Sequence, residues 1–316
     1  MPSNNQRNNE LDFTPTFGTQ QVNINEGDIM RRLIVALLIA MLVFPLFAND
    51  STDINKLIRD SENGDADAQY MLGVSYATGE GVVKNYKQAV YWFEKAANQE
   101  HAEAQISLGF CYDMGEGVEK NPKQAVYWYE KAAEKGNVWA QVRLGLFYHL
   151  GEVVKQNDKL AAYWYEKAAK SGDADAQYDT GYRYHFGKGV IENPKQAVYW
   201  YMKAAEQGNV LAQFSLGFCY YWGVGLVKSD KQAAYWYQKA AEQGNADAQN
   251  LLGERYAKGE GVVQNIQTAY FWYLLAAANG SNDGMVNAHI IAKELSSAQQ
   301  AEIQDRATRW FEEHQK

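Results

Sequence analysis

The chain contains few cysteines and few prolines. Its 316 residues include two Cys and five Pro. Two cysteines are too few for a disulfide framework or a four-cysteine zinc site, so the fold must be held by packing. The Walker loop is missing, and so are the patterns G-x-S-x-G, H-E-x-x-H and G-x-G-x-x-G. The sequence therefore predicts a protein that is not an enzyme and uses no cofactor or metal.

The chain also lacks an excess of positive charge. Its formal net charge is −8, which argues against a general nucleic-acid binder. Hydrophobic residues make up 47% of the chain, enough to bury a core, so disorder is not expected for most of it.

The amino end carries a targeting pattern. Residues 1–29 are polar and rich in Asn and Gln, which predicts a disordered tail or translation upstream of the true start at Met30. Arg31 and Arg32 then precede the apolar run Leu33–Ala48. This order is typical of a secretory signal, so residues 30–48 are predicted to be a signal peptide and the mature chain to be periplasmic or secreted.

A retained membrane anchor is the alternative for this segment. Its 16 apolar residues are short for a membrane helix, which needs about 20. However, the bulky Phe47 stands beside the expected cleavage point, where a small residue is usual. Contact with a membrane is expected only if Leu33–Ala48 is retained, and a buried core helix is the remaining alternative.

The rest of the chain repeats itself every 36 residues. Glycine, for example, recurs at Gly73, Gly109, Gly145, Gly181, Gly217 and Gly253, and an Ala-Gln pair, a Tyr, a Trp and an Ala-Ala pair keep the same register. Six such units fill residues 65–280, preceded by a capping helix within 49–64 and followed by capping helices within 281–316. Cys111 and Cys219 lie three units apart, about 27 Å at about 9 Å per helix layer, so two free, packed thiols are expected.

Each unit is predicted to form two short helices. The first spans Ala66–Thr78 in the first unit, and Gln69, Leu72, Gly73 and Tyr76 share its buried face. We expect Gly73 to let a neighbouring backbone approach closely. The second helix is expected to start after an N-cap at Asn85, Asn121, Asn157, Asn193 or Asn265, and to end at a glycine such as Gly136.

The repeated pattern is A-x-A-Q-x-x-L-G-x-x-Y-x-x-G-x-G-V followed by A-x-x-W-x-x-x-A-A. It resembles the Sel-one-like repeat (SLR), a relative of the tetratricopeptide repeat. The resemblance implies an all-α, right-handed α-solenoid that serves as an adaptor for protein complexes and in bacteria is often exported. Cysteine-rich members bridge the helices of each unit and bind β-lactams; this chain has no such cysteine pairs, so those properties do not carry over. Val153, Thr180 and Leu226 depart from the pattern, and weaker local packing is expected there.

Residues that vary between units are free for recognition. They occupy the places of residues 67, 70, 74, 77 and 78, on the side of the first helix opposite the fixed face. By analogy with the tetratricopeptide repeat, this variable side is the concave face. An apolar groove of this kind usually marks a binding site. The predicted partner-binding residues are Phe110, Met114, Trp139, Leu146, His149, Tyr178, Tyr182, His185, Phe186, Phe214, Phe218, Tyr221 and Trp222.

Three further expectations concern other side chains. For side chains at the places of residues 70 and 74, the alternative to ligand binding is packing between adjacent first helices. The Tyr91-Trp92-Phe93 triplet and its successors hardly vary, which predicts a purely structural role. Acidic Glu103, Asp113 and Asp175 favour a ligand with basic or polar flanks.

The sequence thus predicts a scaffold that binds a protein or peptide in its concave groove. One alternative is a cell-envelope hydrolase or glycan-binding protein that uses a row formed by Asp113, His149 and His185, although ordinary histidines are the simpler interpretation. The other alternative is a purely structural spacer of the cell envelope.

Overall fold

The computed structural model describes residues 54–314, and every regular element in this range is a helix. The predicted tail at 1–29 and the predicted signal peptide at 30–48 lie outside the described residues. Within 54–314, no helix is both long enough and apolar enough to span a bilayer.

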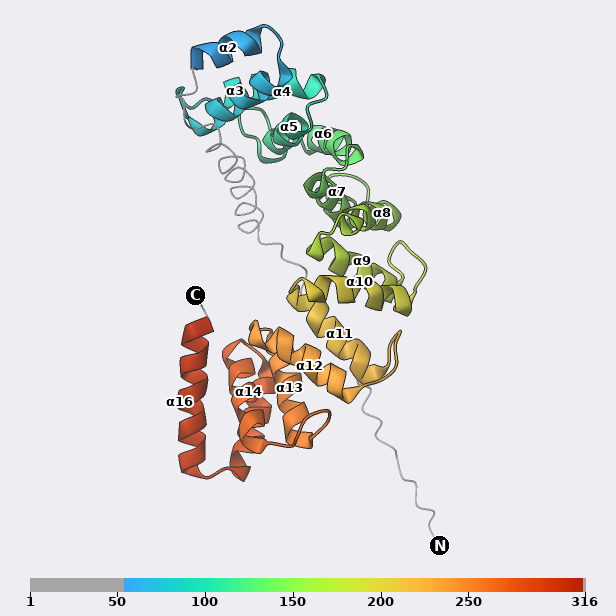
Figure 1. The fold of residues 1–316 in the computed structure, drawn as a ribbon, viewed down its shortest axis with the longest axis vertical. Coiled ribbons are helices and arrows are strands. Elements are labelled where there is room, and N and C mark those ends of the chain that lie inside the picture. Colours follow the sequence, from blue (N-terminus) through green and yellow to red (C-terminus); the bar gives the residue numbers. More distant parts are fainter. Residues whose placement is uncertain (1–53, 315–316) are drawn as a thin grey trace.

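The helices stack in pairs along an arc (Figure 1). In the middle of the arc, α7 lies on the inner side and α8 on the outer side. This arrangement confirms the predicted all-α repeat architecture. The first helices of the units are α3 (Ala66–Thr78), α5 (Ala102–Met114), α7 (Val138–Leu150), α9 (Ala174–Phe186), α11 (Val210–Trp222) and α13 (Ala246–Lys258). The second helices are α4 (Tyr86–Asn98), α6 (Pro122–Glu134), α8 (Asp158–Lys170), α10 (Pro194–Glu206), α12 (Asp230–Glu242) and α14 (Ile266–Ala278).

Additional helices cover both ends of the stack. Helix α2 (Ile54–Glu62) packs on α3. At the other end, α15 (Asn282–Ile291) leads through the short 3₁₀ helix η2 (Ala292–Glu294) to α16 (Ser297–His314). Helix α16 packs on α14, where Trp310 lies 6.1 Å from Trp272 between ring centroids.

Side-chain caps define the helix starts. The predicted N-cap role of Asn85, Asn121, Asn157, Asn193 and Asn265 is confirmed, because each side chain accepts a hydrogen bond from a backbone N–H in the first turn. Gly136 has a φ of 93°, and its counterparts after the later second helices also have positive φ values.

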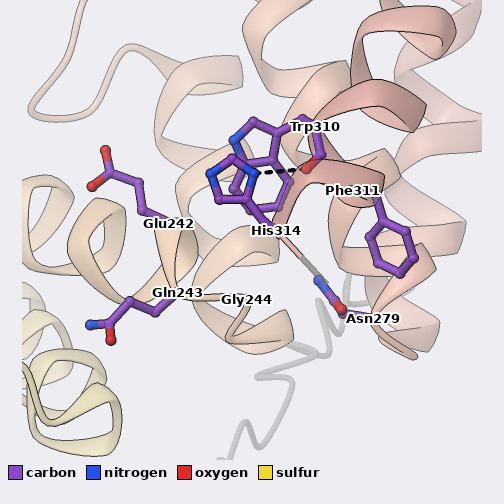
Figure 2. Close-up of a pocket in the computed structure, with 7 residues that line it drawn as sticks. All are labelled: Glu242, Gln243, Gly244, Asn279, Trp310, Phe311 and His314. Carbon is purple, nitrogen blue, oxygen red and sulfur yellow. Dashed lines mark hydrogen bonds between the residues drawn. The ribbon is translucent and has the colours of Figure 1, made fainter. Parts of the chain in front are cut away.

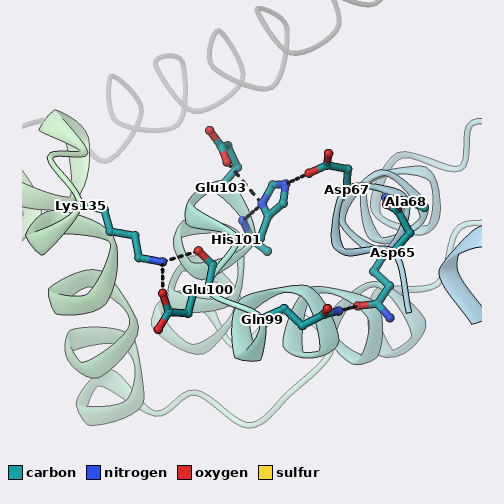
Figure 3. A network of polar contacts seen from close by, with 10 residues as sticks. Asp65, Asp67, Ala68, Gln99, Glu100, His101, Glu103 and Lys135 are labelled. Carbon is teal, nitrogen blue, oxygen red and sulfur yellow. Dashed lines mark hydrogen bonds and ion pairs between the residues drawn. The ribbon is translucent and has the colours of Figure 1, made fainter. Parts of the chain in front are cut away.

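The second unit departs from this capping pattern (Figure 3). His101 is its N-cap, and its Nδ1 accepts a hydrogen bond from the Ala104 N–H at 3.2 Å while its Nε2 lies 3.2 Å from Asp67. Before it, Glu100 has a φ of 67° and is the only non-glycine residue in the described range with a positive φ. Its carboxylate lies 3.3 Å from the Lys135 ammonium.

The fixed glycine of each first helix makes room for an aromatic ring. A Cβ atom on Gly217 would lie 2.4 Å from Cδ1 of Tyr237, and one on Gly73 would lie 2.6 Å from the Phe93 ring but 3.3 Å from the Ala89 carbonyl. The expectation that Gly73 lets a neighbouring backbone approach closely is therefore confirmed for the Ala89 carbonyl, but a side chain comes closer. The closest approach is that of a ring on the second helix of the same unit.

The fixed glutamines join consecutive units. The Gln213 amide donates to the carbonyl of Ala205 at 3.2 Å, and its own oxygen accepts from Gln243 at 2.8 Å. Cys111 and Cys219 are both free and buried, as expected, and burial raises the pKa of each thiol to about 12.

The positions that depart from the repeat pattern behave differently from one another. Thr180 is buried where the other units have Leu, and its hydroxyl has no hydrogen-bond partner. Val153 lacks the positive φ of the loop glycines that it replaces. Leu226 is partly buried and packs against the core of its unit. The departure at Thr180 thus leaves a buried hydroxyl without a partner in the described structure.

The aromatic triplets are only partly structural. Trp92 and Phe93 are buried, with 8% and 4% of their surface exposed, but Tyr91 is 46% exposed. The prediction that the whole triplet serves packing is therefore wrong for its first residue.

Candidate functional site

Four first helices end in an exposed apolar side chain. Met114, Leu150, Phe186 and Trp222 are the last residues of α5, α7, α9 and α11, and their exposed fractions are 40%, 50%, 38% and 59%. We call these four residues the apolar stripe. Each is followed by a glycine in the left-handed conformation, which ends the helix. Thr78 and Lys258 hold the same place in the outer units.

Leu150 was not among the predicted binding residues. A step of 36 residues from Met114 leads to Leu150, so the same repeat period that identified Met114 also identifies this residue.

A second row lies one turn before the apolar stripe. Phe110, Leu146, Tyr182 and Phe218 are half-buried. The Tyr182 ring lies 4.7 Å from that of Phe186, and the Phe218 ring lies 6.3 Å from that of Trp222. These contacts give the exposed rings an apolar base.

Lys188 holds Tyr182 in place. Its ammonium lies 4.8 Å from the centre of the Tyr182 ring and donates a hydrogen bond to the Tyr182 hydroxyl at 3.0 Å. The ring is therefore fixed before any ligand arrives.

Three other predicted binding residues contact the core. The ring of Tyr178 lies 5.8 Å from that of Tyr201, Phe214 lies 5.9 Å from Tyr237, and Trp139 lies 5.1 Å from Tyr129. In each pair, the partner ring belongs to a buried residue of a second helix. Tyr178 and Phe214 thus pack against the second helix of their own unit, whereas the alternative expected from the sequence was packing between adjacent first helices.

The residues at the place of Ala77 lie between adjacent first helices. Asp113 is buried and forms an ion pair with Arg143 of the next unit. The His185 ring lies 6.3 Å from Phe218, and the Arg255 guanidinium lies 4.2 Å above the Tyr221 ring. These side chains join units to each other.

The row of Asp113, His149 and His185 forms no common site. His149 lies 3.8 Å from Asp158, whereas Asp113 is engaged by Arg143. No group of three His, Cys, Asp or Glu residues in the described part of the chain is arranged to hold a metal ion. Burial lowers the pKa of His149 and of His185, so both imidazoles are neutral at neutral pH.

The three acidic residues expected to favour a basic ligand all contact other residues of the protein. Asp113 is paired within the protein, so its expected role toward a basic ligand is not supported. Glu103 lies 3.3 Å from His101, and Asp175 accepts a hydrogen bond from Asn209 at 2.9 Å.

The loops that follow the first helices carry a further set of carboxylates, Glu80, Glu116, Glu152 and Glu260, each two residues after the helix end. We call these four residues the acidic rim.

Two small hollows lie at the C-terminal cap. One of about 100 Å³ is lined by residues of α12, the end of α14 and α16 (Figure 2). In it, His314 stacks on Trp310 with a centroid distance of 4.0 Å, and its Nδ1 lies 2.8 Å from the Trp310 carbonyl. Neither of these two hollows is lined by a residue of the apolar stripe, whose side chains are exposed on the surface.

Comparison with known proteins identifies the repeats. The Sel1 repeat model matches six consecutive segments, residues 66–101, 102–137, 140–173, 174–209, 210–245 and 246–281. A search of curated proteins found no match.

Solved structures give the same family. The crystal structure of a Sel1 repeat protein from Oxalobacter formigenes is 30% identical, covers 83% of this chain and 78% of its own, and has a TM-score of 0.64. A protective antigen of uropathogenic Escherichia coli with an SLR fold is 27% identical over 84% of this chain and 88% of its own, with a TM-score of 0.32. With six matched repeats in the sequence and a solved relative of the same architecture, this chain belongs to the Sel1 repeat family.

Proposed function

We propose that this protein is a non-enzymatic adaptor that binds a protein or peptide segment along its first helices. The observation that carries the proposal is the apolar stripe, in which four successive units each expose one large apolar side chain at the same place. Exposed apolar side chains that continue over several units favour a binding surface over a solvated one. The half-buried second row supports the stripe from below.

The surroundings of the stripe define the chemistry of the ligand. Two residues of the acidic rim, Glu116 and Glu152, lie in the loops directly after Met114 and Leu150 of the stripe, and the chain as a whole carries a net charge of −8. A ligand with apolar or aromatic side chains flanked by Lys or Arg is complementary to both features. The openness of the stripe favours an extended segment over a small molecule.

Export of the chain is part of the same proposal. Residues 30–48 have the order of charges and apolar residues that is typical of a signal peptide, which would place the adaptor in the periplasm or outside the cell. The intact mass of protein recovered from that compartment tests this point. A mature chain that starts well before Asn49 would contradict cleavage.

Selection from a displayed peptide library tests the binding function, with the full chain as bait. We expect enrichment of peptides that combine two or more apolar side chains with Lys or Arg. Phe186→Ser with Trp222→Ser should weaken binding of the selected peptides by about tenfold or more, because hot-spot aromatic residues each contribute about 2 kcal/mol.

Val227→Ser with Val263→Ser is the matched control. Both valines are 87% exposed and lie in loops, so this variant removes two exposed apolar side chains without touching the stripe. Equal binding by the stripe variant and the wild type, or an equal loss in the control, would count against the proposal.

A further inference from the structure

The second helices carry a basic and aromatic pattern that packing does not require. In five successive units, Lys, Tyr and Lys stand four residues apart, which places them on one face of the helix. We call this set the Lys-Tyr-Lys ladder. Its rungs are Lys87-Tyr91-Lys95, Lys123-Tyr127-Lys131, Lys159-Tyr163-Lys167, Lys195-Tyr199-Lys203 and Lys231-Tyr235-Lys239.

The ladder faces solvent. Its five tyrosines are 46% to 49% exposed, whereas the Trp that follows each of them is buried. Within the described chain, none of the ten lysines forms an ion pair with a carboxylate. Ten of the thirty basic residues of an acidic protein therefore lie on one face without a counter-charge.

Each rung has a fixed geometry. The second lysine lies over the tyrosine ring, with distances from the ammonium to the ring centre of 4.7 to 5.9 Å. Each tyrosine ring also meets the following Trp ring edge to face at about 5 Å. The ring and its lysine are thus held in place before binding. A flexible surface would lose side-chain entropy when it ordered the same groups on a ligand.

The sixth unit shows what the same face looks like when protein covers it. There, Gln267, Phe271 and Leu275 replace the three ladder residues. Phe271 and Leu275 are buried, and Arg306 of α16 lies 4.3 Å above the Phe271 ring. The lysines are absent where α16 docks and present in the five units where no helix of residues 54–314 docks on this face. The open rungs are therefore suited to a charged ligand and not to helix packing.

We propose that the Lys-Tyr-Lys ladder binds a linear acidic polysaccharide. A ladder of equal rungs matches a polymer of equal units, which a folded protein partner does not offer. Carboxylates on such a polymer can pair with the lysines, while the tyrosine provides an apolar ring for a sugar and a hydroxyl for hydrogen bonding.

The charge density favours a polysaccharide over a nucleic acid. The two lysines of a rung lie two helical turns apart, about 12 Å, and the ladder contains no arginine. Nucleic-acid binding rests on the dense neutralisation of phosphates, which lysines this far apart do not provide. Sparse lysines interleaved with rings fit carboxylates that are carried on sugar rings.

The rungs differ in their acidic neighbours. Glu94, Glu130 and Glu166 stand three residues after the tyrosines of the first three rungs, and Glu130 accepts a hydrogen bond from Tyr148 at 2.8 Å. Met202 and Gln238 hold this place in the fourth and fifth rungs. These two rungs lack the competing carboxylate, so they are expected to contribute most of the affinity.

Binding of the full chain to polygalacturonate tests the proposal, with neutral dextran as the reference polymer. We expect binding to polygalacturonate that weakens with salt and strengthens with polymer length, since several weak pairs must act together.

The combined variant K195Q, K203Q, K231Q and K239Q should bind about tenfold more weakly, because each exposed pair contributes only about 0.2 to 1 kcal/mol. The variant K56Q, K84Q, K120Q and K155Q changes the net charge equally, lies off the ladder and should bind within about twofold of the wild type.

Tyrosine variants separate ring recognition from simple charge attraction. Tyr199→Ser with Tyr235→Ser should lose most binding, and Tyr→Phe at both positions should retain most of it. An equal loss in the two lysine variants, no loss in the serine variant, or equally tight binding of poly-glutamate or a single-stranded oligonucleotide would overturn the proposal. None of these residues belongs to the apolar stripe, so this outcome is independent of the peptide selection.

Discussion

Gly217 and its counterparts determine how closely the two helices of each unit approach. A methyl group at Gly217 would meet the Tyr237 ring at 2.4 Å, and Tyr237 is buried with 1% of its surface exposed. Gly217→Ala is therefore expected to destabilise the protein by about 1 to 3 kcal/mol through overpacking, although alanine favours a helix. Urea unfolding measures the change.

A second substitution checks the cause. In Gly217→Ala with Tyr237→Leu, the ring that causes the clash is gone, so the combined loss should be smaller than the sum of the two single losses. Additive losses would show that the ring is not the reason for the glycine.

Asp179 is expected to make stability depend on pH. It lies on α9, and burial raises the pKa of its carboxyl to about 7, helped by Asp175 and Asp173 and opposed by Arg183. Its ordinary value is 3.8, so between about pH 4 and pH 7 the folded state binds more protons than the unfolded state. Stability from this group is therefore lost as the pH rises through that range. Tyr165 and Tyr178 are the other titratable groups that interact with it.

Asp179→Asn should remove this dependence. The variant should gain stability over the wild type as the pH rises from 4 to 8, by an amount of about 1 kcal/mol or more. Chemical unfolding at several pH values measures the difference. A constant offset between the two proteins, or a gain at acidic pH alone, would contradict the assignment.

Single residues also mark the limit of what the sequence predicts. The repeat period identified the glycine, the glutamine and the caps, because these serve the same contact in every unit. It could not show that Asp113 is neutralised by Arg143, since this pair joins two positions that vary between units. Such contacts depend on the relative position of two adjacent first helices, which cannot be deduced from the sequence of one unit.

At the scale of the helix, the glutamine–glutamine contacts within units are incomplete. Gln99, Gln207 and Gln243 donate from the ends of α4, α10 and α12 to the glutamine of the preceding first helix. Ser171 holds this place after α8, and the buried oxygen of Gln141 has no hydrogen-bond partner. A buried unsatisfied acceptor costs about 1 to 3 kcal/mol.

Ser171→Gln should satisfy that acceptor and stabilise the protein by about 0.5 to 1.5 kcal/mol. Ser171→Ala is the matched control, which removes the serine without supplying a donor. Thermal unfolding of both variants measures the effect. If the alanine variant gains as much as the glutamine variant, the missing hydrogen bond is not the cause.

The helix boundaries could be predicted from the sequence, whereas the exposure of the variable side chains on the first helices could not. The first helix was predicted at Ala66–Thr78, where α3 lies, because caps and glycines punctuate each unit. Which variable positions remain open was not predictable in the same way. Side chains at the place of Ala77 are covered by the next first helix, and those at the helix end, such as Leu150, are not.

At the scale of the molecule, the two helices of a unit present different chemistry. The first helices expose an apolar stripe beside an acidic rim, and the second helices expose rings between lysines. A solenoid keeps both sets in register over many units, because each unit repeats the orientation of the last. One chain can therefore hold two ligands of unlike charge on separate faces.

The most direct test of the adaptor function asks where a bound peptide lies. A photoreactive side chain is placed at Leu150 on the apolar stripe or, in a second protein, at Tyr163 on the ladder, and each full chain is irradiated with a peptide selected by the wild type. We expect cross-linking from position 150 and none from position 163. Cross-linking from position 163 alone, or from neither position while the peptide is bound, would contradict the assignment of the apolar stripe as the peptide-binding surface.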